Sequence, residues 1–310
     1  MINQGIKDKT LFLWLDSNEF HAVNAQRRGV AIANVFRNMP KVFKAIRRLQ
    51  IKLNVGSIYP WLDLSWVHNL DKYDTVIIHA SKLTPPVVKY INKKKPDIRV
   101  IVWYWNPIVK SEPLESFTTK NCEIWVFDEQ DAINHKLKHN TQYYFKDIHV
   151  AKKEKTNDVV FVGGDKGRLS YLLKIKKELK NIGIMSDFHI VGSSKFNKAG
   201  YKYNHRIPYS EILEKIHKSK AILDVVSDNQ SGLTLRPLEA LFFSKKLITN
   251  DKNILNRDFY EPNNIFVLGV DEESELIDFL NKPMQEINSI IRDKYDFDEW
   301  LSRFNINKSS

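Results

Sequence analysis

The chain has 310 residues and a mass of 36.4 kDa, enough for two domains that each bury a hydrophobic core. With 43% hydrophobic residues, 27% charged residues and a net charge of +11, it is not a collagen, a coiled coil or a disordered chain. One cysteine, Cys122, excludes an internal disulfide bond, and no apolar run reaches the ~18–20 residues of a membrane-spanning helix. The first ten residues lack the apolar core of a secretory signal, so we expect a cytoplasmic protein.

Short β-rich segments alternate with longer helical patterns, which is typical of βα units around a mostly parallel sheet. The predicted strands of the first half are Thr10–Leu15, Thr75–His79, Arg99–Tyr104, Cys122–Phe127 and Gln142–Phe145. The predicted helices are Asn24–Phe36, Met39–Leu53 with Asn38 as its N-cap, Thr84–Lys94 and Glu129–Lys138.

Basic residues concentrate near the N-terminus. Between Phe20 and Leu62 there are eight of them and no acidic residue: Arg27, Arg28, Arg37, Lys41, Lys44, Arg47, Arg48 and Lys52. Such a block predicts a phosphate-bearing partner, either an anionic lipid, a nucleic acid or a charged substrate.

The predicted helix Met39–Leu53 is amphipathic as well as basic. Its apolar residues recur at helical spacing on one face and four of its cations share another: Met39, Val42, Phe43, Ile46, Leu49 and Leu53 against Lys41, Lys44, Arg48 and Lys52. This division predicts either a helix that lies on an anionic membrane surface or an ordinary surface helix that packs its apolar stripe on the sheet.

The polar segment Ala151–Asn157 predicts a linker, after which a second α/β unit begins. Its predicted strands are Asp158–Val162, Phe188–Val191, Ala221–Val226, Lys246–Thr249 and Asn264–Val267. Its predicted helices are Leu169–Asn181, Tyr209–Ser219, Leu235–Phe243, Glu273–Leu280 and a C-terminal segment Met284–Phe304 that carries Trp300 and Phe304. We therefore predict an α/β protein with two domains, residues 1–150 and 151–310, and a ligand cleft between them beyond the carboxyl ends of the strands.

A glycine turn follows the first strand of this second unit. Gly163 and Gly164 would let backbone N–H groups approach an anion, while Lys166 and Arg168 supply charge at a helix start. The turn predicts a phosphate cradle; the alternative is a solvated turn with incidental charges.

A second polar turn precedes the predicted helix Leu235–Phe243. It offers hydroxyl, amide and glycine groups at Gln230, Ser231, Gly232 and Thr234, followed on the helix by Arg236 and Glu239. Together with the first turn it predicts a diphosphate site, in which Arg236 would offset the charge that develops on a leaving phosphate. The alternative is that Thr234 caps the helix and Glu239 pairs with a surface lysine.

The segment Gln230–Leu241 and the loop Phe161–Arg168 resemble the donor-binding half of the GT-B-fold nucleotide-sugar glycosyltransferases. The branch of the family that they resemble works in bacterial capsule, O-antigen and lipopolysaccharide assembly. Phe127-Asp128 with Asp131-Ala132, and Trp105-Asn106-Pro107, are similar to that branch too. The resemblance implies two Rossmann-like domains in the GT-B architecture.

The resemblance also implies roles for single residues. Glu239 matches the acid that binds the nucleotide ribose in many such enzymes, and Lys166 and Arg168 fall where basic groups meet the donor diphosphate. Ser231 departs from the family, since many retaining relatives have a glutamate there that contacts the donor sugar. Ser244, with Lys245-Lys246, departs where relatives usually have Gly and Pro before the strand.

No metal or other cofactor is expected. The Asp296-Phe297-Asp298 triplet predicts solvent-facing charge on a helix, because a hard cation needs several converging oxygens. On the acceptor side the candidate general bases of an inverting transferase are Asp16 and then His79, both at strand ends. Glu19, His21 and the pair Trp105 and Asn106 are further acceptor-side candidates. Each of these could equally be a capped turn or a satisfied buried polar group.

The sequence thus predicts a metal-independent glycosyltransferase that moves a sugar from a nucleoside-diphosphate donor to a glycan or lipid-linked acceptor, at the inner face of the membrane if the basic helix binds there. Two alternatives stay open. One is a nucleotide-sugar epimerase or phosphorylase on the same fold. The other is a nucleic-acid-binding protein that uses the basic block, which no motif of that class supports.

Overall fold

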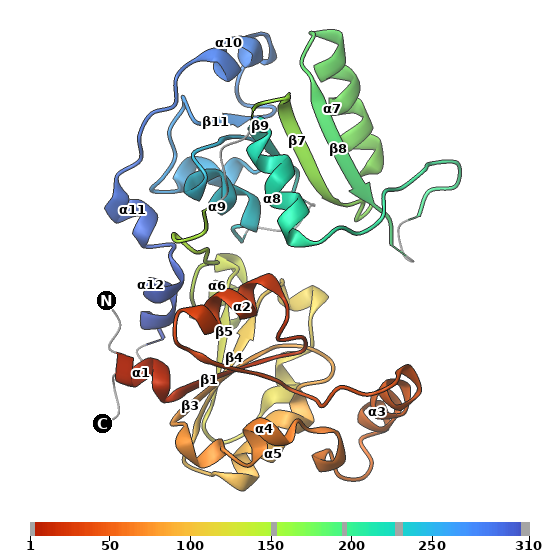
Figure 1. Cartoon of the computed structure of the whole chain (residues 1–310), viewed down its shortest axis with the longest axis vertical. Helices are drawn as coiled ribbons and strands as arrows, with labels where there is room; N and C mark the ends of the chain where they lie inside the picture. Colours follow the sequence, from red (N-terminus) through yellow and green to blue (C-terminus); the bar gives the residue numbers. More distant parts are fainter. Residues whose placement is uncertain (1–3, 150–153, 194–196, 227–231, 305–310) are drawn as a thin grey trace. The chain divides into compact units, whose positions relative to one another are not determined.

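Six parallel strands form the first sheet of the computed structural model, in the order β2-β1-β3-β4-β5-β6 (Figure 1). Their bounds are β1 Thr10–Trp14, β2 Ala31–Asn34, β3 Thr75–His79, β4 Arg99–Tyr104, β5 Cys122–Val126 and β6 Lys138–His139. Every residue of β1 is buried, as expected for an inner strand of a parallel sheet covered on both faces. The carboxyl ends of β1, β3 and β4 are therefore neighbours at one edge of this sheet.

Helices connect these strands. They are α1 Gln4–Asp8, α2 Phe20–Arg27, α3 Lys41–Leu53, α4 Leu64–Val67, α5 Pro85–Lys94 and α6 Glu129–His135, with short 3₁₀ turns at Tyr59–Trp61, Leu70–Lys72, Ile108–Lys110 and Leu114–Phe117. The predicted cap of α3 is wrong, because Pro40 occupies the N-cap position and the Asn38 amide oxygen accepts from Lys44 Nζ at 3.3 Å instead.

The predicted helix Asn24–Phe36 is wrong over its second half. The α2 helix stops at Arg27, and Gly29 follows in the left-handed region at φ 87°. The chain then enters β2, which pairs with β1 in parallel. Glycine tolerates this backbone turn without the steric penalty of a Cβ atom, and the apolar run after it fits a strand as well as a helix.

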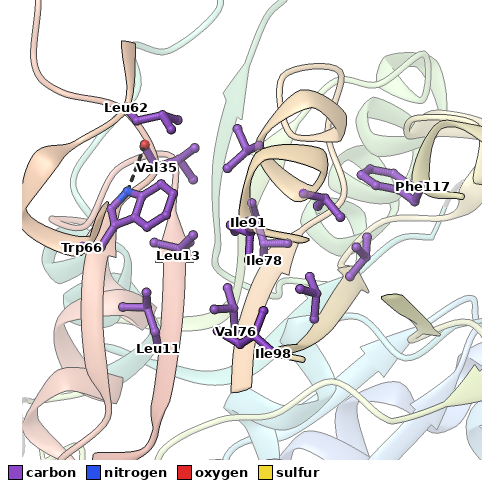
Figure 2. Packing of buried hydrophobic residues seen from close by; sticks show 14 of the residues in the cluster. Leu11, Leu13, Val35, Leu62, Trp66, Val76, Ile78, Ile91, Ile98 and Phe117 are labelled. Atoms are coloured by element: carbon purple, nitrogen blue, oxygen red, sulfur yellow. Dashed lines mark hydrogen bonds between the residues drawn. The ribbon is translucent and has the colours of Figure 1, made fainter. Parts of the chain in front are cut away.

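The core on one face of the first sheet combines branched aliphatic side chains with the aromatic residues Phe36, Trp66, Tyr104 and Phe117. Figure 2 shows Leu11 and Leu13 of β1 beside Val76 and Ile78 of β3, with Trp66 closing one side. The indole N–H of Trp66 donates to the Val35 carbonyl oxygen at 3.2 Å, so this buried polar atom has its partner.

The second sheet has five parallel strands in the order β11-β10-β9-β7-β8. Their bounds are β7 Asn157–Gly164, β8 Ser186–Val191, β9 Ser219–Asp224, β10 Lys246–Thr249 and β11 Ile265–Val267. The longer helices are α7 Leu169–Asn181, α8 Tyr209–His217 and α9 Leu235–Phe242, followed by α10 Leu276–Asn281, α11 Ser289–Asp293 and α12 Phe297–Ser302, with 3₁₀ turns at Lys252–Asn256 and Glu273–Glu275. Gln142–Phe145 forms no strand, and the single helix predicted for Met284–Phe304 is the separate pair α11 and α12.

The structure describes residues 4–149, 154–193, 197–226 and 232–304. They form two units, one made of residues 4–142 with 297–304 and one made of residues 143–296. The two parallel sheets confirm an α/β protein with two Rossmann-like domains. The unit boundary lies at Gln142 and Tyr143, whereas the sequence placed it at 150 and 151. None of the helices described is long and apolar enough to span a membrane.

The helix α12 belongs to the first unit. Trp300 and Phe304 are fully buried there, and the Trp300 ring lies 6.0 Å from Phe12 and 5.5 Å from Trp103, between centroids. Asn140 donates to the Trp300 carbonyl oxygen at 3.0 Å. The aromatic residues of the C-terminal segment are thus part of the core of the first unit.

Replacing Ser244 by glycine is expected to stabilise the second unit. Ser244 follows the α9 C-cap at φ 50°, and Lys245 N–H returns to the Ala240 carbonyl oxygen at 2.9 Å, which is the Schellman arrangement. A left-handed residue with a Cβ atom costs about 1–2 kcal/mol, and glycine loses part of that gain through its unfolded-state entropy. We expect a net gain of about 0.5–1 kcal/mol in a urea unfolding curve; a decrease would contradict the strain.

Candidate functional site

The carboxyl ends of β7 and β9 lie side by side in the second sheet and carry the donor-side residues. Gly163 and Gly164 are the last two residues of β7, paired in register with Ile190 and Val191 of β8. The sequence placed them in a loop after the strand, so β7 is longer than predicted at this end. A Cβ atom on Gly163 would meet the Phe161 ring at 3.1 Å, which explains why glycine fits here.

The start of α7 is already occupied by a carboxylate of the chain itself. Asp165 Oδ1 accepts from the N–H groups of Gly167 at 3.1 Å and Leu169 at 2.9 Å, and Oδ2 accepts from the Tyr203 hydroxyl at 2.5 Å. Two amides at the start of α7 are therefore satisfied by Asp165, and phosphate binding by Gly163, Gly164, Lys166 and Arg168 stays a prediction. Lys166 remains exposed on this turn, at φ 50°.

Arg168 lies over the aromatic ring of Phe161, with its guanidinium carbon 5.3 Å from the ring centroid. Its Nη2 donates to the Gly164 carbonyl oxygen at 3.3 Å. Its Nε is buried and has no hydrogen-bond partner among the described residues. Burial lowers the pKa of Arg168, while Asp224 opposes this shift. The guanidinium therefore has a donor left for an acceptor group that the described chain does not supply.

The N-terminus of α9 has no side-chain cap. Thr234 occupies the N-cap position, but its hydroxyl donates to Asp224 Oδ2 at the end of β9, at 2.7 Å. The alternative in which Thr234 caps the helix is therefore wrong. Gly232, next to it, is buried, and Gln230 and Ser231 lie outside the described residues. The Thr234 side chain therefore does not cap the first turn of α9, where backbone N–H groups favour an anion.

Glu239 forms the centre of a buried polar network. Its side chain is 0% exposed, one carboxylate oxygen forms an ion pair with Arg236, and the other accepts from the Tyr209 hydroxyl. Tyr144 extends the network, with 2.9 Å between the two phenol oxygens, and Arg236 Nη2 donates to the Val162 carbonyl oxygen at 3.1 Å. The alternative in which Glu239 pairs with a surface lysine is wrong. Its role in binding the donor ribose stays a prediction.

The charges at this edge nearly balance. Arg168 and Arg236 interact with the two carboxylates Asp224 and Glu239. Burial lowers the pKa of Arg236, but the Glu239 carboxylate outweighs it, so the net shift is upward. Burial raises the pKa of Asp224, although Thr234 and both arginines oppose the rise. The arrangement holds two guanidinium groups in fixed positions, the state in which such groups best stabilise an added anion. No pattern in the sequence pointed to Tyr144 and Tyr209, and Asp224 stood out only as the first residue of the polar segment that precedes α9.

In the first unit, an aromatic cluster lies at the carboxyl ends of β1, β3 and β4. The His79 ring lies 4.3 Å from Trp14 and 5.5 Å from Trp105, and the His21 ring lies 5.1 Å from Trp105, between centroids. Of the predicted acceptor-side residues the structure thus brings together His21, His79 and Trp105. Trp14 was not among the predicted site residues, because its position in the predicted strand Thr10–Leu15 is that of an ordinary buried residue.

Burial lowers the pKa of both His21 and His79 to about 3, with His21 adding to the shift of His79. A general base works best when its pKa is near the working pH, so burial weighs against His79 as the base. Neutral His79 retains a buried Nε2 with no hydrogen-bond partner among the described residues.

Acid is expected to destabilise the first unit through these histidines. Their folded pKa of about 3 lies below the unfolded value of 6.5, so the unfolded chain binds more protons between these pH values. The free energy of unfolding should fall as the pH drops below about 6.5, by about 1.4 kcal/mol per pH unit for each histidine. His79→Phe should remove one such contribution in urea curves at pH 4 to 7, whereas the same change at the exposed His68 should not. Equal slopes in both variants would contradict the assignment.

Asp16 and Asn106, unlike the residues of this cluster, are exposed. Asp16 is exposed in the turn after β1, and its Oδ1 accepts from the backbone N–H and side-chain amide of Asn18 at 3.0 and 3.1 Å. Its charge contributes, after burial, to a raised pKa of Glu19. Asn106 is exposed after β4. A catalytic role for Asp16 stays a prediction.

The carboxylates of the Asp296-Phe297-Asp298 triplet are not solvent-facing, so that part of the prediction is wrong. Asp296 is 1% exposed and accepts from the Lys146 N–H at 2.9 Å, while Asp298 forms ion pairs with Lys7 and Arg28 at 2.8 and 3.2 Å. Among the residues the structure describes, no group of three or more His, Cys, Asp or Glu side chains could hold a metal ion.

Residues 170–298 match the family model described as glycosyl transferase-like. A comparison of the sequence with curated proteins finds no match. Among solved structures, TarM matches with a TM-score of 0.52 and 12% identity, over 79% of this chain and 57% of TarM. The apo lipopolysaccharide outer core galactosyltransferase WaaB (TM-score 0.46, 14% identity, 94% and 87% covered) and the spinosyn forosaminyltransferase SpnP (0.44, 13%, 97% and 99%) match less well in three dimensions.

The family match covers most of the second unit, including α9 with Arg236 and Glu239. The TarM likeness concerns the fold, which it shares over most of this chain. The chain thus combines two Rossmann-like units with a segment, residues 170–298, that is similar to the glycosyl transferase-like family.

Proposed function

We propose that the enzyme transfers a sugar from a nucleoside-diphosphate sugar to a glycan or lipid-linked acceptor in the assembly of a bacterial surface polysaccharide. The observation that carries the proposal is the pair Arg168 and Arg236 at the carboxyl ends of β7 and β9, next to the uncapped start of α9. The class of pathway rests on the resemblance of the sequence around Gly232–Leu241 to the enzymes of capsule, O-antigen and lipopolysaccharide assembly.

In such a transfer, the bond between the anomeric carbon and the diphosphate oxygen breaks, and the electron pair stays on the diphosphate. Guanidinium groups and helix N–H dipoles that are fixed before the reaction stabilise this charge without reorganising. Arg168 has its buried Nε as the donor for this task. We therefore expect transfer to need no metal ion.

The acceptor must lose a proton when its hydroxyl attacks. Asp16, an exposed carboxylate directly after β1, would take this proton in an inverting enzyme, and in a retaining enzyme the donor phosphate would take it instead. The partly exposed ring of Trp105 supplies an apolar face of the kind that sugars pack against, and the buried Trp14 lies beside it.

The test combines binding and product analysis. Calorimetric titration with UDP, GDP, CDP and ADP identifies the donor nucleotide, and the matching nucleotide sugars are then incubated with lipid-linked glycan acceptors, with and without EDTA. We expect one nucleotide to bind and sugar transfer to continue in EDTA. Binding of none of the diphosphates would contradict the proposal, and donor isomerisation or phosphorolysis without transfer would favour an epimerase or phosphorylase.

A further inference from the structure

The apolar face of α3 is exposed to solvent. Five of its apolar side chains share one face of the helix, and their exposed fractions are 68% for Val42, 46% for Phe43, 47% for Ile46, 57% for Leu49 and 59% for Leu53. Scattered single apolar residues are normal on a surface, but five on one helix face form a contiguous patch. Figure 1 shows α3 at the periphery of the first unit, away from its sheet.

The helix α3 is attached to the first unit by its other side. Its only buried residue is Arg47, whose guanidinium carbon lies 3.8 Å from the centroid of the Phe36 ring, and Ile51 packs partly against the core. A helix that stabilised the unit in the ordinary way would bury its apolar stripe and expose its arginine. The hypothesis that α3 packs its apolar stripe on the sheet is therefore wrong.

The groove beside α3 is strongly basic. It has a volume of about 1170 Å³ and is lined by residues of α3, α5 and the loops next to them. Its charged lining consists of one acid, Glu112, and six cations: Arg48, Lys52, Lys82, Lys89, Lys93 and Lys94. Among the described residues, no ion pair joins these cations to a carboxylate. The groove thus adds a concentrated positive potential to an exposed apolar helix face.

We propose that α3 docks the enzyme on an anionic lipid bilayer, with its apolar face in the headgroup and acyl boundary and the cations of α3 and α5 attracted to the lipid charge. Both features are needed to bind a charged membrane from one side. A nucleic acid would use the cations but leave the apolar face exposed. A second copy of the chain would bring α3, which has no acidic residue, against its own like charge. The proposal goes beyond the transfer reaction and does not rest on it, because docking needs neither donor nor acceptor.

The experiment is sedimentation of the full chain with vesicles of 30% phosphatidylglycerol in phosphatidylcholine, and with vesicles of phosphatidylcholine alone. We expect binding to the anionic vesicles and at least about tenfold weaker binding to the neutral ones, since each cation near the surface contributes about a fivefold factor. Ile46→Ser with Leu49→Ser should weaken binding to the anionic vesicles at least about tenfold.

The matched control changes two exposed apolar residues elsewhere in the same unit, Val109→Ser with Ile133→Ser, which are 82% and 70% exposed. This control should bind as the unchanged chain does. Thermal melting of both double variants shows that each is folded. Equal losses in the two variants, or no binding of the unchanged chain to anionic vesicles, would overturn the proposal. The proposal would also be overturned if sedimentation velocity showed a dimer of the unchanged chain and the variant Ile46→Ser with Leu49→Ser were a monomer.

A second set of variants tests whether the lysines of the groove contribute to membrane binding. Lys89→Gln with Lys93→Gln, on α5, should lower the affinity for anionic vesicles by about tenfold or more, whereas Lys177→Gln with Lys180→Gln, exposed on α7, should change it by less than about threefold. Equal effects of the two pairs would show that net charge alone drives binding, and would overturn the role of the groove.

Discussion

Replacing Glu239 by alanine is expected to lower the free energy of unfolding by about 3–5 kcal/mol, a large share of the stability of a domain. The carboxylate is fully buried and is held by Arg236 and Tyr209, so its removal leaves the largely buried guanidinium without its counterion. Urea unfolding measures the loss. Glu178→Ala, which breaks the exposed pair of Glu178 with Lys174, should cost less than about 1 kcal/mol.

Two further variants separate charge from shape at this position. Glu239→Gln keeps an oxygen for the Tyr209 hydroxyl but removes the charge opposite Arg236. Arg236→Met with Glu239→Leu removes both charges, and apolar replacements of a buried pair are often close to neutral. If the double variant were as unstable as Glu239→Ala, the loss would not come from an unpaired buried cation. Because Glu239 is fully buried, a change at this residue tests the stability of the second unit as well as donor binding.

Replacing Arg168 by methionine is expected to lower the rate of sugar transfer by about 10²–10³, the usual effect of removing one fixed donor from a developing negative charge. Methionine keeps an apolar stem beside the Phe161 ring but removes the buried Nε and the charge. The measurement is kcat and KM for the donor, together with calorimetry of the nucleoside diphosphate.

Arg168→Lys distinguishes electrostatic stabilisation from packing, because it restores charge but not the guanidinium plane. Partial recovery of kcat with the lysine variant is the expected result. Lys177→Met, on the exposed side of α7, should leave kcat and KM unchanged. Loss of activity in Arg168→Met together with a matching loss of folded protein would assign Arg168 a structural role instead.

Much of the fold is predictable because parallel sheets need runs of buried residues. The helix Leu169–Asn181 and the strands Thr75–His79, Arg99–Tyr104 and Lys246–Thr249 have the bounds that the sequence predicted. Errors fall where one apolar run suits two structures. The residues after Gly29 form β2 because they pair with β1, and this partner is distant enough in sequence that the local pattern does not show it.

The sequence predicts where the candidate site lies better than it predicts which residues contact one another there. The turns after β7 and β9 do carry the polar residues, as the rule for parallel sheets requires. The spacing of residues along the chain does not predict the hydrogen-bond partners of these polar groups. Tyr144 joins the Glu239 network although it lies far from Glu239 in sequence, and Asp165 accepts from two amides at the start of α7. Local sequence shows which groups are present, but long-range packing decides which of them are already satisfied.

Because α12 packs in the first unit, the core of that unit combines residues that are synthesised early with residues that are synthesised much later. Phe12, Trp103 and Trp125 are covered by Trp300 and Phe304, which leave the ribosome almost 300 residues after Phe12. Until α12 has been made, the rings of Phe12, Trp103 and Trp125 lack these contacts. The N-terminal Rossmann-like unit therefore completes its core only after α12 has been synthesised.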